Sequence, residues 1–224
     1  MTAHDRDIHD IHDTRDTRDV RDTHDSDIGD IRALNRRAVL TSVEIVSRAT
    51  ADDLGRATPC VEWNLGDLLA HMTAQHHGFA AAARGRGDDL AVWRTGPLGA
   101  DPSGTYAAAA ESVLAAFAED GVPERRFALP EIATGFRFPG AQSIGFHFID
   151  YVVHGWDVAR SLGLPFELDA DLAEPALRIA QAVPDGPRRL EPHAAFRPGL
   201  PAAADAAALH RILATLGRSP AWPN

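Results

Sequence analysis

The sequence predicts an all-α protein, and three observations support that fold class. Residues 31–49, 64–83, 103–119 and 142–163 place apolar side chains at the i, i+3, i+4 and i+7 spacing of amphipathic helices. Long connections separate these four stretches, which permits crossovers rather than a tight up-and-down bundle. The chain has 224 residues, 45 % of them apolar, which is enough for one domain with a sizeable core.

Composition and charge exclude several functional classes. The net charge is −10 and there is no basic stripe to suit a phosphate backbone, so we expect no nucleic-acid partner. We expect no membrane insertion, because no apolar run approaches the length of a span, and the N-terminus does not resemble a signal peptide. The single cysteine, Cys60, rules out an internal disulfide and favours a cytoplasmic setting, with the residue as a small buried hydrophobe.

Residues 1–29 are predicted to be a disordered, low-complexity tail. Residues 4–27 hold nine Asp, four Arg and four His, in a repeat of His-Asp and Arg-Asp pairs with a period of about three. That period suits neither a helix nor a strand, and few apolar groups are available for burial. A weak His/Asp metal scavenger is the alternative role for this segment. The folded part is therefore expected over residues 30–224.

The second predicted helix carries the first ligand candidate. Asn64 is a good N-cap, and Asp67 three residues later completes a capping-box-like pair. His71 lies at the edge of the apolar face of this helix, where a lone histidine is by default a satisfied core residue. His76 and His77, further along, are expected to be solvated or to line the mouth of a pocket.

The remaining elements follow from turn residues and helical spacing. Residues 103–119 form an alanine-rich third helix, and residues 120–140 break every few positions, which permits a loose hairpin. Phe127, Phe136 and Phe138 would pack over one end of the bundle. After the fourth helix, residues 169–183 and 203–216 are predicted to form two further helices.

The fourth helix, at residues 142–163, has one polar stripe on an otherwise apolar circumference. At about 100° per residue, His147, Asp150, His154 and Asp157 fall on the same side. Asp150 and His154 stand at i, i+4, where two side chains can reach one ion. Because a buried carboxylate is costly unless it is paired or binds a metal, we interpret the stripe as half of a metal site, for which His71 is a candidate third ligand.

Three segments together resemble a known family. They are T-P-C-V-E-W-N-L-G-D-L-L-A-H-M, F-H-F-I-D-Y-V-V-H-G-W-D-V-A-R-S-L-G and A-A-A-L-H-R-I-L-A-T-L-G-R-S-P-A-W. They resemble the actinobacterial metal-binding branch of the DinB/YfiT-like superfamily, which includes the N-terminal domain of mycothiol-dependent maleylpyruvate isomerase. The resemblance covers about residues 30–224 and implies a DinB-like four-helix bundle of up-down-down-up type, with extra C-terminal helices.

The resemblance also implies a metal site and a chemistry. Its divalent metal ligands carry over to His71, Asp150 and His154, with Asp at the position where the isomerase has Glu. Zinc is the first expectation, and nickel or iron are alternatives. Mycothiol is the implied co-substrate, and an electrophilic small molecule its partner in a thiol transfer or isomerisation. The isomerase has a further C-terminal domain, for which the residues at this chain's C-terminal end are too few.

Several functional alternatives remain open from the sequence. His147 and Asp157 are the candidate general bases, with His147 as a possible fourth ligand and Asp157 as the hydrogen-bond partner of a histidine ring. A non-catalytic metal-binding protein, a metal-dependent hydrolase and a helical scaffold without metal are the other functions considered. The apolar bundle surface could also support a homodimer.

Overall fold

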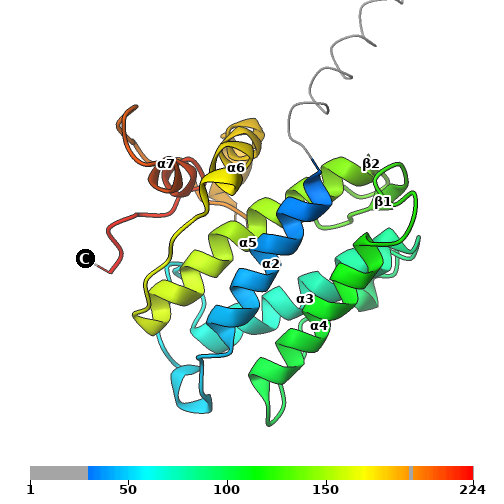
Figure 1. The fold of residues 1–224 in the computed structure, drawn as a ribbon, viewed down its shortest axis with the longest axis horizontal. Coiled ribbons are helices and arrows are strands. Elements are labelled where there is room, and N and C mark those ends of the chain that lie inside the picture. The colour runs from blue at the N-terminus through cyan, green and yellow to red at the C-terminus, as the bar shows by residue number, and fades with distance from the viewer. Residues whose placement is uncertain (1–29, 192–193, 224) are drawn as a thin grey trace, which may run out of the picture. The chain divides into compact units, whose positions relative to one another are not determined.

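The computed structural model describes residues 30–191 and 194–223, and most of this part of the chain is helical (Figure 1). The bundle consists of four long helices: α2 (Ile31–Val46), α3 (Leu65–Ala83), α4 (Pro102–Phe117) and α5 (Gly140–Leu162). Two shorter helices follow, α6 (Ala170–Ala182) and α7 (Ala208–Thr215). The predicted all-α class is confirmed. The predicted tail at residues 1–29 lies outside the described residues.

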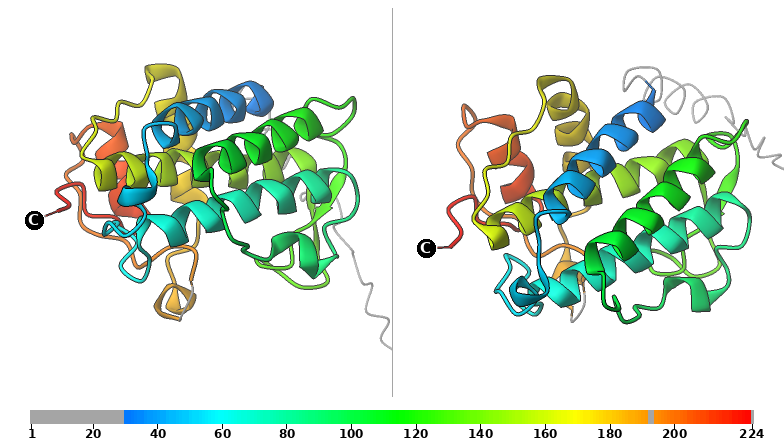
Figure 2. Two further views of the ribbon diagram at one scale, coloured as in Figure 1. Left: turned by 90° about the horizontal axis from the view of Figure 1, so that it is seen from below. Right: turned by 60° about the horizontal axis from the view of Figure 1, so that its bottom comes forward.

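The four long helices pair in an order that requires crossovers. α2 packs chiefly against α5, and α3 packs chiefly against α4. Figures 1 and 2 show α3 and α4 running in the same direction, opposite to α2 and α5. This is the up-down-down-up order that the family resemblance implied. Two parallel neighbours cannot be joined by a tight turn, which accounts for the long connection between α3 and α4.

Trp93 fixes the connection between α3 and α4 to the bundle. It ends a short 3-10 helix, Leu90–Trp93, and its indole Nε1 donates a 2.9 Å hydrogen bond to the carbonyl of Gly87. Its ring lies against Gly78 on α3, where an added Cβ would come within 2.2 Å of the indole. Position 78 must therefore be glycine for the crossover to lie this close to α3.

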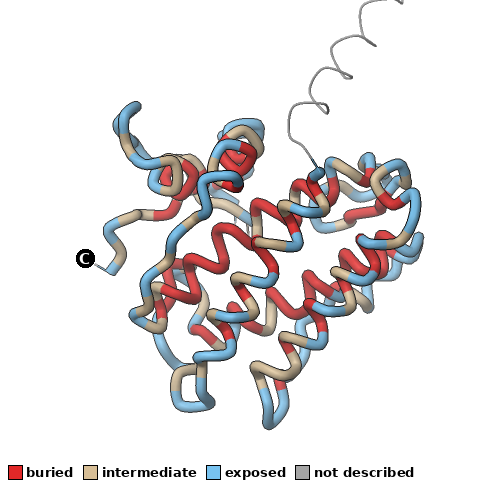
Figure 3. The backbone as a smooth tube through the Cα atoms, viewed as in Figure 1, coloured by how far each residue is buried: buried red, intermediate tan, exposed pale blue. Residues whose placement is uncertain are grey.

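Helix α5 forms the central wall of the core. Ile144, Phe148 and Val153 on this helix are completely buried, and each contributes roughly 1.5–3 kcal/mol through the burial of its apolar side chain. Figure 3 shows the buried residues along the inner sides of the four long helices. The helix ends at Gly163, whose φ of 72° allows the amide of Leu164 to donate to the carbonyl of Ala159 at 2.8 Å.

The predicted loose hairpin is a short antiparallel pair of strands. β1 (Arg126–Ala128) pairs with β2 (Arg137–Pro139), with Phe127 opposite Phe138. Phe127 is fully buried, whereas Phe136 is half exposed and contacts the ring of Phe138. The expectation that all three phenylalanines pack over one end therefore holds fully only for Phe127.

Helix α7 begins later than the sequence predicted. The prediction started at residue 203, but the helix starts at Ala208. Its N-cap residue, Ala207, makes no side-chain hydrogen bond, and Ala203 and Ala204 before it are exposed. Helix propensity alone does not stabilise a short helix in water, so the helix begins only where apolar packing starts, next to the buried Ile212 and Leu213.

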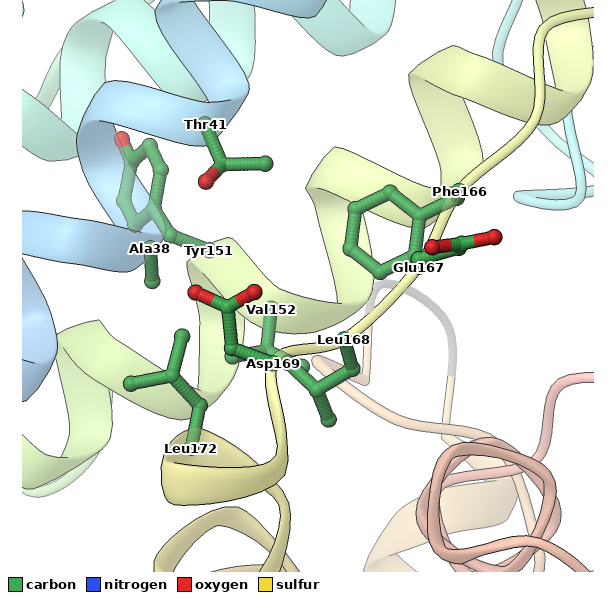
Figure 4. A pocket seen from close by; sticks show the side chains of 9 residues that line it. All are labelled: Ala38, Thr41, Tyr151, Val152, Phe166, Glu167, Leu168, Asp169 and Leu172. Carbon is green, nitrogen blue, oxygen red and sulfur yellow. The ribbon is translucent and has the colours of Figure 1, made fainter.

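The space between α2, α5 and the chain after Gly163 is nearly filled. A pocket of about 10 Å³ lies there, lined in part by Thr41, Tyr151, Phe166 and Asp169 (Figure 4). A volume of that size holds about one water molecule, so this pocket is too small to be a substrate site. None of the helices in the described part of the chain has both the length and the apolar character needed to cross a membrane.

Two histidines face each other inside the bundle, and the prediction for one of them, His76, is wrong. His76 is 0 % exposed rather than solvated, and its Nδ1 is 3.2 Å from Nε2 of His147. Nδ1 of His147 lies 2.7 Å from the Oδ1 atom of Asn35. Because that oxygen only accepts, Nδ1 of His147 carries the proton and Nε2 accepts from His76. Tyr151 stacks on both rings, with centroids 4.2 Å from each.

The buried histidine pair should make the fold sensitive to acid. Burial lowers the pKa of His147 to about 3 and that of His76 well below its ordinary value. In the unfolded chain both would titrate near 6.5. As the pH falls below about 6.5, these two histidines bind protons in the unfolded chain but not in the folded one. The free energy of unfolding therefore falls by up to about 1.4 kcal/mol per pH unit for each histidine.

We expect the His147→Gln variant to lose less stability than the wild type between about pH 7 and pH 5, measured by urea unfolding. The His77→Gln variant changes an exposed histidine on the same helix and should keep the wild-type slope. Equal slopes for His147→Gln and the wild type would contradict the proposed origin of the acid sensitivity.

Candidate metal centre

The three metal-ligand candidates from the sequence come together in space. His71 on α3 meets Asp150 and His154 on α5, and one possible ligand atom from each lies within 4.8 Å of the others. His154 is buried and the other two are partly exposed. The rings of His71 and His154 have centroids 5.5 Å apart and meet edge to face. The structure thus places the two-histidine, one-carboxylate set where α3 and α5 approach each other.

Local sequence features place each of these side chains. The side chain of Asn64 accepts from the amide of Asp67 at 2.9 Å and that of Asp67 accepts from the amide of Asn64, so the capping box is confirmed. It fixes where α3 starts and therefore which direction His71 faces. On α5, the i, i+4 spacing brings Oδ1 of Asp150 to 3.4 Å from Nε2 of His154.

The charges in the cluster suit a cation. Burial, with the nearby His154, lowers the pKa of His71 to about 3, so its imidazole is neutral and keeps a lone pair. Burial alone would lower the pKa of His154, but Asp150 and Asp157 on its two sides raise it well above the ordinary value. Burial raises the pKa of Asp150. A proton on His154 thus balances the carboxylates beside it, and a divalent cation bound at Nε2 could take the place of that proton.

Asp157 holds the far side of the His154 ring. Its Oδ2 lies 2.9 Å from Nδ1 of His154, and its side chain is completely buried. Burial would raise the pKa of Asp157, but Arg218 and His154 hold it below its ordinary value. A charged carboxylate accepts hydrogen bonds only, so Nδ1 of His154 is a donor and Nε2 is the nitrogen available to a metal.

These observations indicate that the residues fit a divalent metal. The donor set is two imidazole nitrogens and one carboxylate oxygen, as in catalytic zinc sites with an open position and in non-haem iron sites. In such sites, the ring nitrogen of a ligand histidine that does not bind the metal usually makes a hydrogen bond that orients the ring. His154 has that support from Asp157. His71 contacts the ring of Trp63, with centroids 4.6 Å apart.

A second possible donor set lies on the other side of the same histidine. Cys60, His154 and Asp157 also offer ligand atoms within 4.8 Å of one another. Sγ of Cys60 is 3.2 Å from Oδ2 of Asp157, so Cys60 is not the plain buried hydrophobe that the sequence suggested. Its position follows from the hydroxyl of Thr58, which accepts from the Cys60 amide and donates to the carbonyl of Trp63.

The two candidate bases from the sequence lie away from open space. Both nitrogens of His147 are engaged by Asn35 and His76 inside the bundle, and the structure does not bring His147 into the metal cluster. Asp157 is 0 % exposed and its oxygens contact His154, Cys60 and Arg218. For Asp157 this geometry corresponds to the alternative that the sequence left open, a hydrogen bond to a histidine ring.

Sequence reasoning missed two side chains near the centre. Arg218, just after α7, reaches Asp157 across 61 positions of sequence, and no pattern within α5 pointed to it. Glu131, between the two strands, accepts a 2.6 Å hydrogen bond from Nε2 of Gln75, one helical turn after His71. Partial burial raises the pKa of Glu131, and the negative charge of Asp150 raises it further.

Comparison with known proteins identifies a matching family. A family model described as the mycothiol maleylpyruvate isomerase N-terminal domain matches residues 36–159, which is more than half of the chain. The chain belongs to this family. The matched region spans α2 to α5 and includes His71, Asp150, His154 and Asp157, whereas Arg218 lies outside it.

Relatives of this family member fall into two groups. Two uncharacterized Mycobacterium tuberculosis proteins, MT0763 and Rv0738, are each 29 % identical over 192 residues, covering 83 % of this chain and 96 % of theirs. Crystal structures of the mycothiol-dependent maleylpyruvate isomerase and of a histidine-to-alanine mutant of it superpose with TM-scores of 0.51 and 0.53. They are 16 % and 14 % identical over 71 % of this chain and 70 % of theirs, so this likeness shows a common fold.

Replacing Asp150 should separate the stability of the metal-free protein from metal binding. Because burial raises the pKa of this carboxyl, the Asp150→Asn variant should be at least as stable as the wild type without metal. Zinc at about 100 times its dissociation constant would stabilise the wild type by about 2.7 kcal/mol and the variant by close to none. Thermal unfolding with and without zinc tests this, with Asp205→Asn, at an exposed loop position, as control. Equal zinc stabilisation of Asp150→Asn and the wild type would contradict the assignment.

Proposed function

We propose that this chain is a divalent-metal protein that performs thiol transfer or isomerisation with mycothiol or a similar small thiol. The observation that carries the proposal is the convergence of His71, Asp150 and His154, with ligand atoms within 4.8 Å of one another. Membership of the mycothiol maleylpyruvate isomerase N-terminal domain family supports a thiol as co-substrate.

The proposed roles of the residues follow from their contacts. A divalent ion held by the three ligands would lower the pKa of a bound thiol, which makes the thiolate available near neutral pH. His71 supplies a neutral nitrogen, and Asp150 supplies negative charge. Asp157 keeps Nε2 of His154 directed toward the other two ligands. Trp63 packs beside both histidines, with ring centroids 4.6 Å from His71 and 6.5 Å from His154, and would shield one side of the site from water.

The ligand set favours zinc, with nickel and iron as alternatives. Two imidazoles and a carboxylate suit all three ions, and selection among them depends on geometry and supply. Aspartate is one methylene shorter than glutamate, so an ion bound by Asp150 would lie closer to the α5 backbone than one bound by a glutamate there.

Metal analysis of protein purified without a nickel-affinity step tests the first half of the proposal. We expect about one equivalent of metal per chain in the wild type. The His71→Ala variant should bind zinc more than about 100-fold more weakly, because loss of a metal ligand should reduce affinity more than loss of a residue that only orients a ligand. The His77→Ala variant removes an exposed histidine from the same helix and should bind like the wild type. A His71→Ala protein with unchanged metal content would refute the site.

Calorimetric titration with mycothiol tests the second half. We expect the zinc-loaded protein to bind reduced mycothiol, and the zinc-free protein and the His71→Ala variant to bind it at least about 10-fold more weakly, since a direct thiolate–metal contact would be lost. The disulfide form of mycothiol, which has no free thiol, is the matched ligand control. If the holoprotein takes up metal but gives no heat with reduced mycothiol, the function is metal binding without thiol chemistry.

A further inference from the structure

The second donor set, formed by Cys60, His154 and Asp157, is already in contact with a positively charged side chain of the protein, that of Arg218. The guanidinium of Arg218 donates from Nε to both oxygens of Asp157, at 3.1 and 3.2 Å, and from Nη2 to Oδ2 at 3.2 Å. Nη2 also lies 3.1 Å from Sγ of Cys60. Arg218 is only 5 % exposed. Every donor that Cys60 and Asp157 could offer to a metal therefore faces a fixed positive charge.

A helix-ending motif after α7 directs the chain so that Arg218 reaches Asp157 and Cys60. Gly217 has a φ of 77°, and its amide donates to the carbonyl of Ala214. The amide of Arg218 donates at 2.8 Å to the carbonyl of Leu213. This pair of bonds is a Schellman motif, which reverses the chain after the helix. An added Cβ at position 217 would lie 2.5 Å from the carbonyl oxygen of Arg197, so the turn requires glycine on two counts.

We propose that Arg218 is a positioning residue that closes the Cys60–His154–Asp157 set to metals and directs Nε2 of His154 toward His71 and Asp150. Two donor sets share one imidazole, and each would use a different ring nitrogen. With Arg218 paired to Asp157, the carboxylate keeps its hydrogen bond to Nδ1, and a cation approaching Cys60 is repelled. The second half of this inference, on the direction of Nε2, rests on the proposed function, whereas the first half does not.

If Arg218 did not block it, the second donor set could compete with the first for a metal ion. A cysteine thiolate, an imidazole and a carboxylate together form a donor set that binds zinc and other soft divalent ions well. An ion held there would take Nδ1 of His154 and remove the support that Asp157 gives to the ring. Arg218 lies outside the region that matches the family model, so the segment after residue 159 would contribute directly to the centre.

Cobalt(II) substitution gives a direct readout, because a cysteine–cobalt bond produces a charge-transfer band in the near ultraviolet that nitrogen and oxygen ligands do not. The wild type with cobalt, and without added thiol, should lack this band. The Arg218→Gln variant keeps a hydrogen-bond donor for Asp157 but no charge, and should show the band. Arg218→Lys keeps the charge and should lack it. The band in Arg218→Gln should vanish when Cys60→Ala is added.

Arg189 provides a matched control. It is also 5 % exposed, and its guanidinium donates to backbone carbonyls, including those of Pro184 and Thr215, rather than to the centre. Arg189→Gln removes a buried arginine from the same C-terminal segment and should give no band.

Zinc affinity at the His71 site, measured in the Arg218→Gln, Cys60→Ala double variant, should fall by about 10- to 100-fold, because His154 loses part of its outer-shell support.

A folded Arg218→Gln protein that shows no band with excess cobalt would overturn the inference, and so would the band in the wild type. Should the Arg218 variants not fold, the single Cys60→Ala variant still decides: an unchanged cobalt spectrum supports the inference, and a changed one shows that Cys60 is already a ligand. These results are distinct from a failure of the proposed function. In that case the wild type would bind no metal at His71, while the band in Arg218→Gln would still report on the second set.

Discussion

The imidazole of His154 is held between two carboxylates inside a helical bundle, and the rest of the centre depends on how those charges are balanced. Asp150 lies 3.4 Å from Nε2 and Asp157 lies 2.9 Å from Nδ1. Burying two carboxylates costs several kcal/mol unless each finds a partner. Arg218 is the partner of Asp157. Among the described residues, Asp150 makes its ionic contact with the His154 imidazole rather than with an arginine, and we propose that a metal cation bound with His71 balances its charge.

Periodicity and capping made much of the fold predictable, and also the convergence of the three candidate ligands. The i, i+4 pair on α5, the capping box at Asn64 and the position of His71 two turns into α3 are all local in sequence. The family resemblance added the bundle order, which periodicity alone leaves open. Arg218 was not predictable in the same way, because its contact with Asp157 spans 61 positions and depends on the turn at Gly217.

Histidines at similar helical positions proved to have different environments. His71 and His76 are only five residues apart on α3, yet one faces a carboxylate and the other a second histidine. A sequence shows that a histidine lies on a given face, but whether its nitrogens meet Asn35, another imidazole or an ion depends on the opposite helix. His147 illustrates this, because it shares the polar stripe of Asp150 and His154 and still points into the core network.

The pairing of α2 with α5 has a consequence for how the chain acquires its structure. α2 buries its apolar side chiefly against a helix that begins about a hundred residues later, while α3 and α4 can associate earlier. During synthesis, the side of α2 that packs against α5 would stay uncovered until α5 leaves the ribosome. The proposed ligands His71 and His154 also belong to these early and late portions. The proposed metal centre would therefore assemble only at a late stage of folding, which would limit premature capture of metal by a nascent chain.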